Sequence, residues 1–254
     1  LGMAFDAEGN LVIADAIQGL ISIDMNGIIN TLSRKSDSDN IPLNFVDDVD
    51  IASDGKIYFS DASSKHGYGS DRLELFEHIP NGRLLVYDPI TQKTTTLLSG
   101  LYFANGVALS SDESFVLVNE TLMYRIQKYW LKGDKAGTSE IFIENLPGFP
   151  DNVSSNEEGI FWVALFNPRN NFVEMSSNKP FLRKIVLRLP EFLQPQPVNH
   201  SFVLGLNENG KVVHNLQYQA NEAYSPITSV KQYNDILYFG SLTHAGWGKI
   251  EVPK

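Results

Sequence analysis

The sequence contains no cysteine, which excludes disulfides, thiolate metal sites and a cysteine nucleophile. No apolar run reaches the ~18–20 residues that a helix needs to cross a bilayer, so no transmembrane segment is expected. Positive charge is also scarce, because 20 Lys and Arg stand against 30 Asp and Glu, a net charge of −10. This balance argues against nucleic acid as a partner and is compatible with cation binding.

The chain does not begin with Met, and no signal peptide is visible at its start. Residue 1 falls inside a predicted strand, so we expect the natural N-terminus to be missing. The compartment and the oligomeric state stay open.

What the chain does have is one repeated sequence motif, or phrase, in five copies. Each copy consists of a short strand, a turn rich in Asp, Glu, Asn and Gly, and a strand of β-branched and aromatic residues. The copies are Leu1–Asp15, Val46–Asp61, Ala104–Glu120, Pro150–Ala164 and Pro226–Ser241. An all-β unit that recurs every ~40–50 residues is typical of a β-propeller.

Further strands are predicted after each copy, so that each copy opens one four-stranded antiparallel blade, innermost strand first. They are Gly19–Asp24, Gly82–Asp88, Lys93–Leu98, Arg125–Leu131, Ser139–Glu144, Phe202–Leu206, Lys211–Leu216 and Trp247–Val252. We therefore predict a single propeller domain over residues 1–254 with five recognisable blades. If the closed ring has six, most of the first blade is absent from this chain.

Two insertions break the regular pattern. Ser63–Asn81 and Asn167–His200 each separate the second and third strands of a blade. Loops of this length in a compact domain are usually lids or binding loops, and surface decoration is the alternative. The apolar spacing within Pro180–Leu193 predicts a short helix that ends or kinks at Pro190.

Polar residues stand where three of the five inner strands begin. They are Asp47 and Asp48, then Asn105, then Asp151 and Asn152. Residues at the same end of the inner strands converge on the axis of a propeller, and oxygen ligands without sulfur or His suit Ca²⁺ or Mg²⁺. The alternative is that these residues serve only turns and strand ends.

Several phrases resemble the strictosidine synthase-like family, within the wider calcium-dependent group that includes paraoxonase, gluconolactonase and regucalcin. The phrases are Phe45–Asp50, Asp54–Lys65, Gly82–Asp88, Phe103–Ser110, Asn145–Val153 and Leu237–His244. The run NLPGFPDNV, followed by a Trp-containing strand, resembles the branch that contains the adipocyte plasma membrane-associated protein. The resemblance covers nearly the whole chain and implies a six-bladed propeller.

The resemblance also implies a metal site. Its ligands would be Asn105, Asp151 and Asn152, with Asp47 where the family usually has Asn. A Glu from the first blade, which the family adds, is not in this chain. The His pair of the paraoxonases is absent near Leu1 and Ala16. The catalytic Glu of strictosidine synthase aligns with Thr228, which cannot act as an acid–base, so we expect no condensation of tryptamine with an aldehyde.

These observations lead to a metal-dependent hydrolase that acts on a small ester or lactone by polarising its carbonyl at a central Ca²⁺, or alternatively Mg²⁺. Asp48 and His244 are the predicted residues that activate water, because a carboxylate that ligates the metal is a poor base. Glu120 is a candidate for a supporting ligand or a solvated loop residue. A non-catalytic binding propeller with a structural cation is the alternative, and strictosidine synthase-type amine–aldehyde or lyase chemistry is disfavoured.

Overall fold

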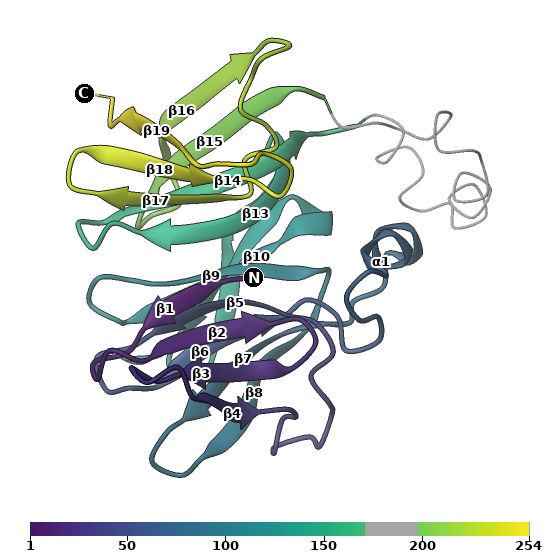
Figure 1. Cartoon of the computed structure of the whole chain (residues 1–254), viewed down its shortest axis with the longest axis vertical. Helices are drawn as coiled ribbons and strands as arrows, with labels where there is room; N and C mark the ends of the chain where they lie inside the picture. Colours follow the sequence, from purple (N-terminus) through teal and green to yellow (C-terminus); the bar gives the residue numbers. More distant parts are fainter. Residues whose placement is uncertain (171–197, 254) are drawn as a thin grey trace.

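The computed structural model describes residues 1–170 and 198–253, and its regular elements are almost all strands of antiparallel sheets (Figure 1). The first sheet contains β1 (Met3–Phe5), β2 (Leu11–Asp15), β3 (Gly19–Ile23) and β4 (Ile29–Ser33). The second contains β5 (Val46–Ile51), β6 (Ile57–Asp61), β7 (Gly82–Asp88) and β8 (Lys93–Leu101). The third contains β9 (Ala104–Leu109), β10 (Phe115–Glu120), β11 (Arg125–Trp130) and β12 (Ser139–Ile143).

The fourth sheet contains β13 (Gly148–Ser155), β14 (Ile160–Pro168), β15 (His200–Asn207) and β16 (Val212–Gln219). The fifth has three strands, β17 (Ser229–Tyr233), β18 (Ile236–Gly240) and β19 (Gly248–Glu251). Helix α1 (Asp71–Glu77) and the short 3₁₀ helix η1 (Thr121–Met123) are the helical elements of the described residues.

The strands follow one another in chain order within every sheet, as expected for propeller blades. The first strands of neighbouring sheets lie against one another, with β5 between β1 and β9, and β13 between β9 and β17. The prediction of an all-β propeller with five recognisable blades is confirmed, and the last blade has three strands where four were expected. The predicted helix Pro180–Leu193 lies outside the described residues.

Turn chemistry explains why the repeated phrase folds into hairpins. In the first copy Asp6 accepts a hydrogen bond from the backbone N–H of Asn10 at 2.7 Å, and Gly9 takes a left-handed φ of 84°. Asp and Asn close such turns with their side chains, and glycine enters the left-handed region without a steric penalty.

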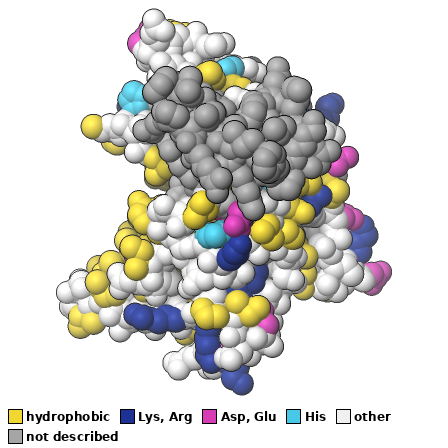
Figure 2. All heavy atoms as spheres, turned by 90° about the vertical axis from the view of Figure 1, so that its right-hand side faces the viewer, with side chains coloured by type: hydrophobic (Ala, Val, Ile, Leu, Met, Phe, Trp, Pro, Cys, Tyr) yellow, Lys and Arg dark blue, Asp and Glu magenta, His cyan; other side chains and the backbone are white. Residues whose placement is uncertain are grey.

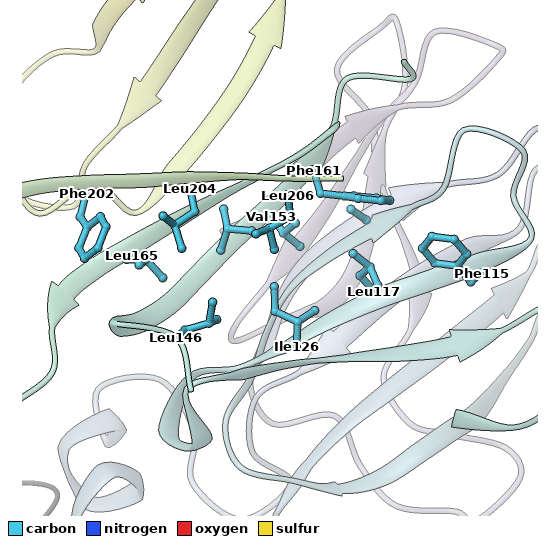
Figure 3. Close-up of a cluster of buried hydrophobic side chains, with 12 residues drawn as sticks. Phe115, Leu117, Ile126, Leu146, Val153, Phe161, Leu165, Phe202, Leu204 and Leu206 are labelled. Carbon is cyan, nitrogen blue, oxygen red and sulfur yellow. The ribbon is translucent and has the colours of Figure 1, made fainter. Parts of the chain in front are cut away.

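The hydrophobic core is divided into four clusters, each lying between two neighbouring sheets. The cluster between the third and fourth sheets is drawn in Figure 3, where Leu117 and Ile126 of one sheet face Val153 and Leu165 of the next. Because inner-strand side chains such as Val49 and Val107 fill these clusters, the packing of the blades sets how the inner strands approach one another.

Two buried ion pairs repeat at the same place in the second and third sheets. Asp61 at the end of β6 pairs with Arg83 at 2.6 Å, and Glu120 at the end of β10 pairs with Arg125. Each carboxylate also accepts a backbone N–H from the residues just before the inner strand of its own sheet, from Phe45 at 2.8 Å and from Tyr102 at 3.0 Å. These pairs therefore anchor the chain where it enters β5 and β9.

Candidate functional site

Three of the five inner strands carry the same irregularity at their beginning. In β5 the pairs Val46–Asp61 and Val49–Phe59 leave two residues of β5 opposite one residue of β6. Strands β9 and β13 repeat this two-against-one pairing with β10 and β14. Such β-bulges re-aim side chains and are frequent near active sites. The bulged residues are Asp47 and Asp48, Asn105 and Gly106, and Asp151 and Asn152.

The other two inner strands pair without a bulge. Strand β1 pairs residue for residue with β2, as β17 does with β18. These are the two copies of the repeat in which the sequence analysis found no oxygen ligand. Thr228 lies just before β17, is buried, and its carbonyl oxygen accepts the backbone N–H of Asn152 at 3.1 Å.

The structure brings Asp47, Asn105 and Asp151 together. Burial raises the pKa of Asp47 well above its usual range, and the charge of Asp151 raises that pKa further. Burial also raises the pKa of Asp151 to about 7, while a hydrogen bond from Asn105 opposes the rise. A positive charge beside two carboxyl groups that repel each other favours the ionised form of both.

Unpartnered oxygen atoms stand on two of the three bulges. The side-chain oxygens Oδ1 of Asn105 and Asn152 are buried and have no hydrogen-bond partner. The amide nitrogen of Asn152 donates to the carbonyl oxygen of Thr228 at 3.0 Å, which fixes the orientation of its side chain. Buried acceptors without a donor are rare in native structures, and a bound cation or an ordered water accounts for them.

The donor set fits a hard divalent cation. Two carboxylates and two carboxamides supply oxygen only, which is the set that Ca²⁺ and Mg²⁺ take. Within residues 1–170 and 198–253, no group of three or more His, Asp or Glu side chains is arranged to hold a metal. A cation here would therefore depend on the carboxamides of Asn105 and Asn152 as well as on the two carboxylates.

Asp48 lies between blades. Its Oδ2 accepts the backbone N–H of Val107 at 2.9 Å, and a Cβ at Gly2 would lie 1.9 Å from its Oδ1. Burial raises the pKa of Asp48 to about 8, although the hydrogen bond from Val107 opposes the rise. The carboxyl group thus joins the second sheet to the first and third, and its role as a base stays a prediction.

His244 lies in the loop after β18, where the sequence placed it. Its side chain is exposed, its ring stacks on Tyr224 with the ring centres 4.8 Å apart, and its backbone N–H lies 3.4 Å from the hydroxyl of Ser241. Neither partner is a candidate ligand, so the described contacts do not join His244 to Asp47, Asn105 or Asp151.

Glu120 is a structural residue rather than a solvated one. It is fully buried, and its carboxylate is bound by Arg125, by Gln127 at 2.9 Å and by the backbone N–H of Tyr102. The bulges were not predicted from the sequence, nor were the contacts of Asn119 and Thr121 beside them. The three bulged segments share no spacing of apolar residues, so the pairing partner is needed to recognise a bulge.

The insertion Ser63–Asn81 leaves β6 just after Asp61, which pairs with Val46 beside the first candidate ligand. Ser63 donates to Glu74 of α1 at 2.8 Å, and a ring nitrogen of His66 lies 2.8 Å from Glu77. Figure 2 shows the face that carries α1, on which hydrophobic, acidic, basic and histidine side chains of the described residues all occur. The prediction that this insertion is a lid or a binding loop stays a prediction.

Together, the sheets and the bulges define a class of protein: a β-propeller whose inner strands gather carboxylate and carboxamide oxygens at one end. The strictosidine synthase family profile matches residues 47–134. A strictosidine synthase-like protein of Arabidopsis thaliana, number 6 of its series, is 35% identical over 255 residues, which is 100% of this chain and 67% of that protein. The adipocyte plasma membrane-associated protein of Rattus norvegicus is 34% identical over 250 residues, 95% of this chain and 66% of that protein.

The solved structures that are similar have the same fold. A gluconolactonase of Xanthomonas campestris aligns with a TM-score of 0.64 at 17% identity and covers 94% of this chain and 68% of its own. A calcium-binding regucalcin of Agrobacterium tumefaciens aligns with a TM-score of 0.59 at 15% identity, covering 96% of this chain and 68% of its own.

The chain belongs to the strictosidine synthase-like family, as the resemblance of its motifs predicted. It spans about two thirds of the length of the curated relatives it matches. No helix of the described residues is long and apolar enough to span a membrane.

Proposed function

We propose that this propeller is a metal-dependent hydrolase of small esters or lactones, with Ca²⁺ as its resident cation and Mg²⁺ as the alternative. The observation that carries the proposal is the cluster of oxygens at three successive bulges. The carboxyl groups of Asp47 and Asp151 repel each other there, Asn105 bonds to Asp151, and the side-chain oxygens of Asn105 and Asn152 on these bulges have no hydrogen-bond partner. Gluconolactonase and regucalcin show the same fold, so they are compatible with this proposal, which rests on the donor set.

A divalent cation held by these oxygens would supply Lewis-acid polarisation of a substrate carbonyl. The chain's own residues then have separate tasks. Asn105 donates to Asp151 and orients its carboxylate, and Thr228 holds the amide of Asn152 through its carbonyl oxygen. Asp48 and His244 are the proposed groups that activate water, and a pKa of about 8 would make Asp48 a base at mildly alkaline pH.

The test removes one carboxamide and one carboxylate. Asn105→Ala and Asp151→Ala are expected to weaken Ca²⁺ binding at least ~10-fold, which corresponds to about 1.4 kcal/mol, and to abolish hydrolysis of aryl esters and lactones. Titration calorimetry and a hydrolysis screen, with and without chelator, measure both effects. Asn30→Ala and Asp134→Ala are matched controls, because both side chains are exposed. Full activity in either site variant, or after chelation, contradicts the proposal.

A second candidate function is a binding propeller with a structural cation. The observation in its favour is that both proposed bases are engaged elsewhere. Asp48 accepts the backbone N–H of Val107 in the neighbouring blade, and His244 is exposed and stacked on Tyr224. A cation that ties several blades together stabilises the native state by mass action. Ca²⁺ binding and a higher melting temperature in Ca²⁺, without turnover of any ester or lactone, would favour this function.

We also propose that the complete ring has six blades. In the first sheet, Met3 and Phe5 of β1 are 60% and 72% exposed. In the fifth sheet, Tyr233 and Trp247 are 69% and 65% exposed. Trp247 lies just before β19, and large exposed apolar side chains on both end sheets mark surfaces that a further blade would cover. A sixth sheet between β1 and β17 in a crystal structure of the full-length protein is the test, and direct contact of these two strands would refute it.

A further inference from the structure

The irregular part of β13 is held by side chains from the neighbouring sheet. The bulge interrupts the ladder between β13 and β14 at Asp151 and Asn152. The carbonyl oxygen of Asp151 accepts the side-chain amide of Asn119 at 2.6 Å, and that of Pro150 accepts the hydroxyl of Thr121 at 2.7 Å. Two successive carbonyl oxygens at the start of the bulge are thus bound from the third sheet.

Asn119 stands at a second bulge as well. Val118 and Glu120 of β10 pair with Val107 and Ala104 of β9, so Asn119 lies between these pairs, opposite the bulged residues Asn105 and Gly106. One side chain therefore connects the bulge that carries Asn105 to the backbone of Asp151. Shifting Asn119 changes both candidate ligand positions at once.

The equivalent positions of the other two bulged sheets do not make this connection. Ser60 stands opposite the bulge of β5, and its hydroxyl accepts the backbone N–H of Asp48 at 3.0 Å, within its own sheet. Ala164 stands opposite the bulge of β13 and has no polar side-chain atom. The bridge made by Asn119 belongs to the junction between the third and fourth sheets.

Burial makes the two bonds strong constraints. Asn119 is 0% exposed and Thr121 is 6% exposed, so neither side chain can exchange its partner for bulk water. The Oδ1 of Asn119 is also buried without a partner, like those of Asn105 and Asn152. The Asn119 side-chain amide keeps its hydrogen bond to the Asp151 carbonyl oxygen. An unsatisfied buried acceptor is costly, and the Asn119 Oδ1 remains available to an ordered water or a cation.

From this arrangement we infer that Asn119 and Thr121 are positioning residues, which hold the bulge of β13 so that the Asp151 carboxylate points toward Asn105. The expected effect on cation affinity rests on the proposed cation site, because the placement of the ligands controls that affinity. The positioning itself is independent of the cation, since it concerns the backbone of Pro150 and Asp151.

The variants distinguish the effect of losing the hydrogen-bond donor from the effect of changing the side-chain volume. Asn119→Leu and Thr121→Val keep the size and remove the donor, whereas Thr121→Ser keeps the hydroxyl and is the matched control. Crystal structures in chelator are expected to show the Asp151 carboxylate displaced by about 1 Å or more in Asn119→Leu and Thr121→Val, with Thr121→Ser like the wild type. The inference is overturned if the bulge of β13 is unchanged in both Thr121→Val, which is the milder variant, and Asn119→Leu.

Calorimetry with Ca²⁺ then separates positioning from simple support of the fold. Positioning predicts that Ca²⁺ affinity falls ~10-fold or more in the two donor-deleted variants and recovers in Thr121→Ser. Lower stability to urea with Ca²⁺ affinity within twofold of the wild type contradicts it. If the wild type binds neither Ca²⁺ nor Mg²⁺, the proposed function fails, and the crystal structures still decide whether these residues hold the bulge.

Discussion

At the scale of single residues, a glycine at the bulge of β9 determines how closely two inner strands approach each other. The two bulged residues of β9 are Asn105 and Gly106, and the glycine lies against the next inner strand. A Cβ at Gly106 would lie 2.3 Å from the backbone nitrogen of Val153 and 2.6 Å from the Cα of Asn152. Glycine is required because two backbones approach each other closely, beside the residues that carry the oxygens.

Gly106→Ala is therefore expected to push β13 away from β9 and to lower the free energy of unfolding by about 1–3 kcal/mol. Urea unfolding measures the change. Gly246→Ala is the matched control, since a Cβ there would meet no atom within 4 Å. Equal unfolding midpoints for the two variants would show that the inner strands have more freedom than the structure indicates.

At the scale of elements, the entry into the inner strands depends on the buried ion pairs. Asp61 is 0% exposed, and Arg83 bridges it to the carbonyl oxygen of Pro42 at 2.7 Å. The same carboxylate accepts the backbone N–H of Phe45, two residues before Asp47. The pair thus joins β6, β7 and the segment before β5, and it places the start of the first bulged strand.

Arg83→Met is expected to destabilise the protein by about 3–5 kcal/mol, because it leaves the Asp61 carboxylate buried and unpaired. Thermal or urea unfolding measures this. Lys56→Met removes an exposed pair with Asp54 and should cost less than ~1 kcal/mol. The double variant Asp61→Asn with Arg83→Met should recover part of the loss, and failure to recover any would mean that packing by Arg83 matters more than its charge.

At the scale of the whole molecule, acidic groups from several sheets meet at the inner strands, where the ammonium group of Leu1 is the positive charge that lowers the pKa of Asp47. The net charge is −10, and the carboxyl groups of Asp47, Asp48 and Asp151 are all buried enough to raise their pKa. The folded state keeps these protons at pH values where an unfolded chain, with a carboxyl pKa near ~3.9, has released them. The free energy of unfolding of the cation-free protein must therefore fall as the pH rises from about 4 toward 8.

Asp48→Asn isolates one part of this effect. The pKa of Asp48 is about 8, and its bond from Val107 can also be accepted by an amide oxygen. In chelator, the variant should resemble the wild type in urea stability at pH 4 and be more stable at pH 8, with a flatter profile between. The same pH dependence in both proteins would show that Asp48 is not protonated in the folded state.

Much of the architecture was accessible from the sequence because it depends on local patterns. Alternating apolar residues and Asp, Asn and Gly turns predicted the strands, for example Gly82–Asp88, which is β7. Recurrence of the phrase predicted the blades, and the residue types predicted which copies carry oxygens. The sequence also indicated Asp47, Asn105 and Asp151 as one set, since they hold the same position in successive copies.

Only the tertiary structure decided how those oxygens are presented. A bulge depends on which residues pair across two strands, and the bond from Asn119 to Asp151 crosses between sheets, so neither is encoded in a local pattern. Likewise, Asp48 joins blades and Glu120 is buried in an ion pair, although the sequence indicated Asp48 as a base and Glu120 as a supporting ligand or a solvated loop residue. Composition and periodicity determine which elements form, whereas burial and cross-strand register determine which way each side chain points.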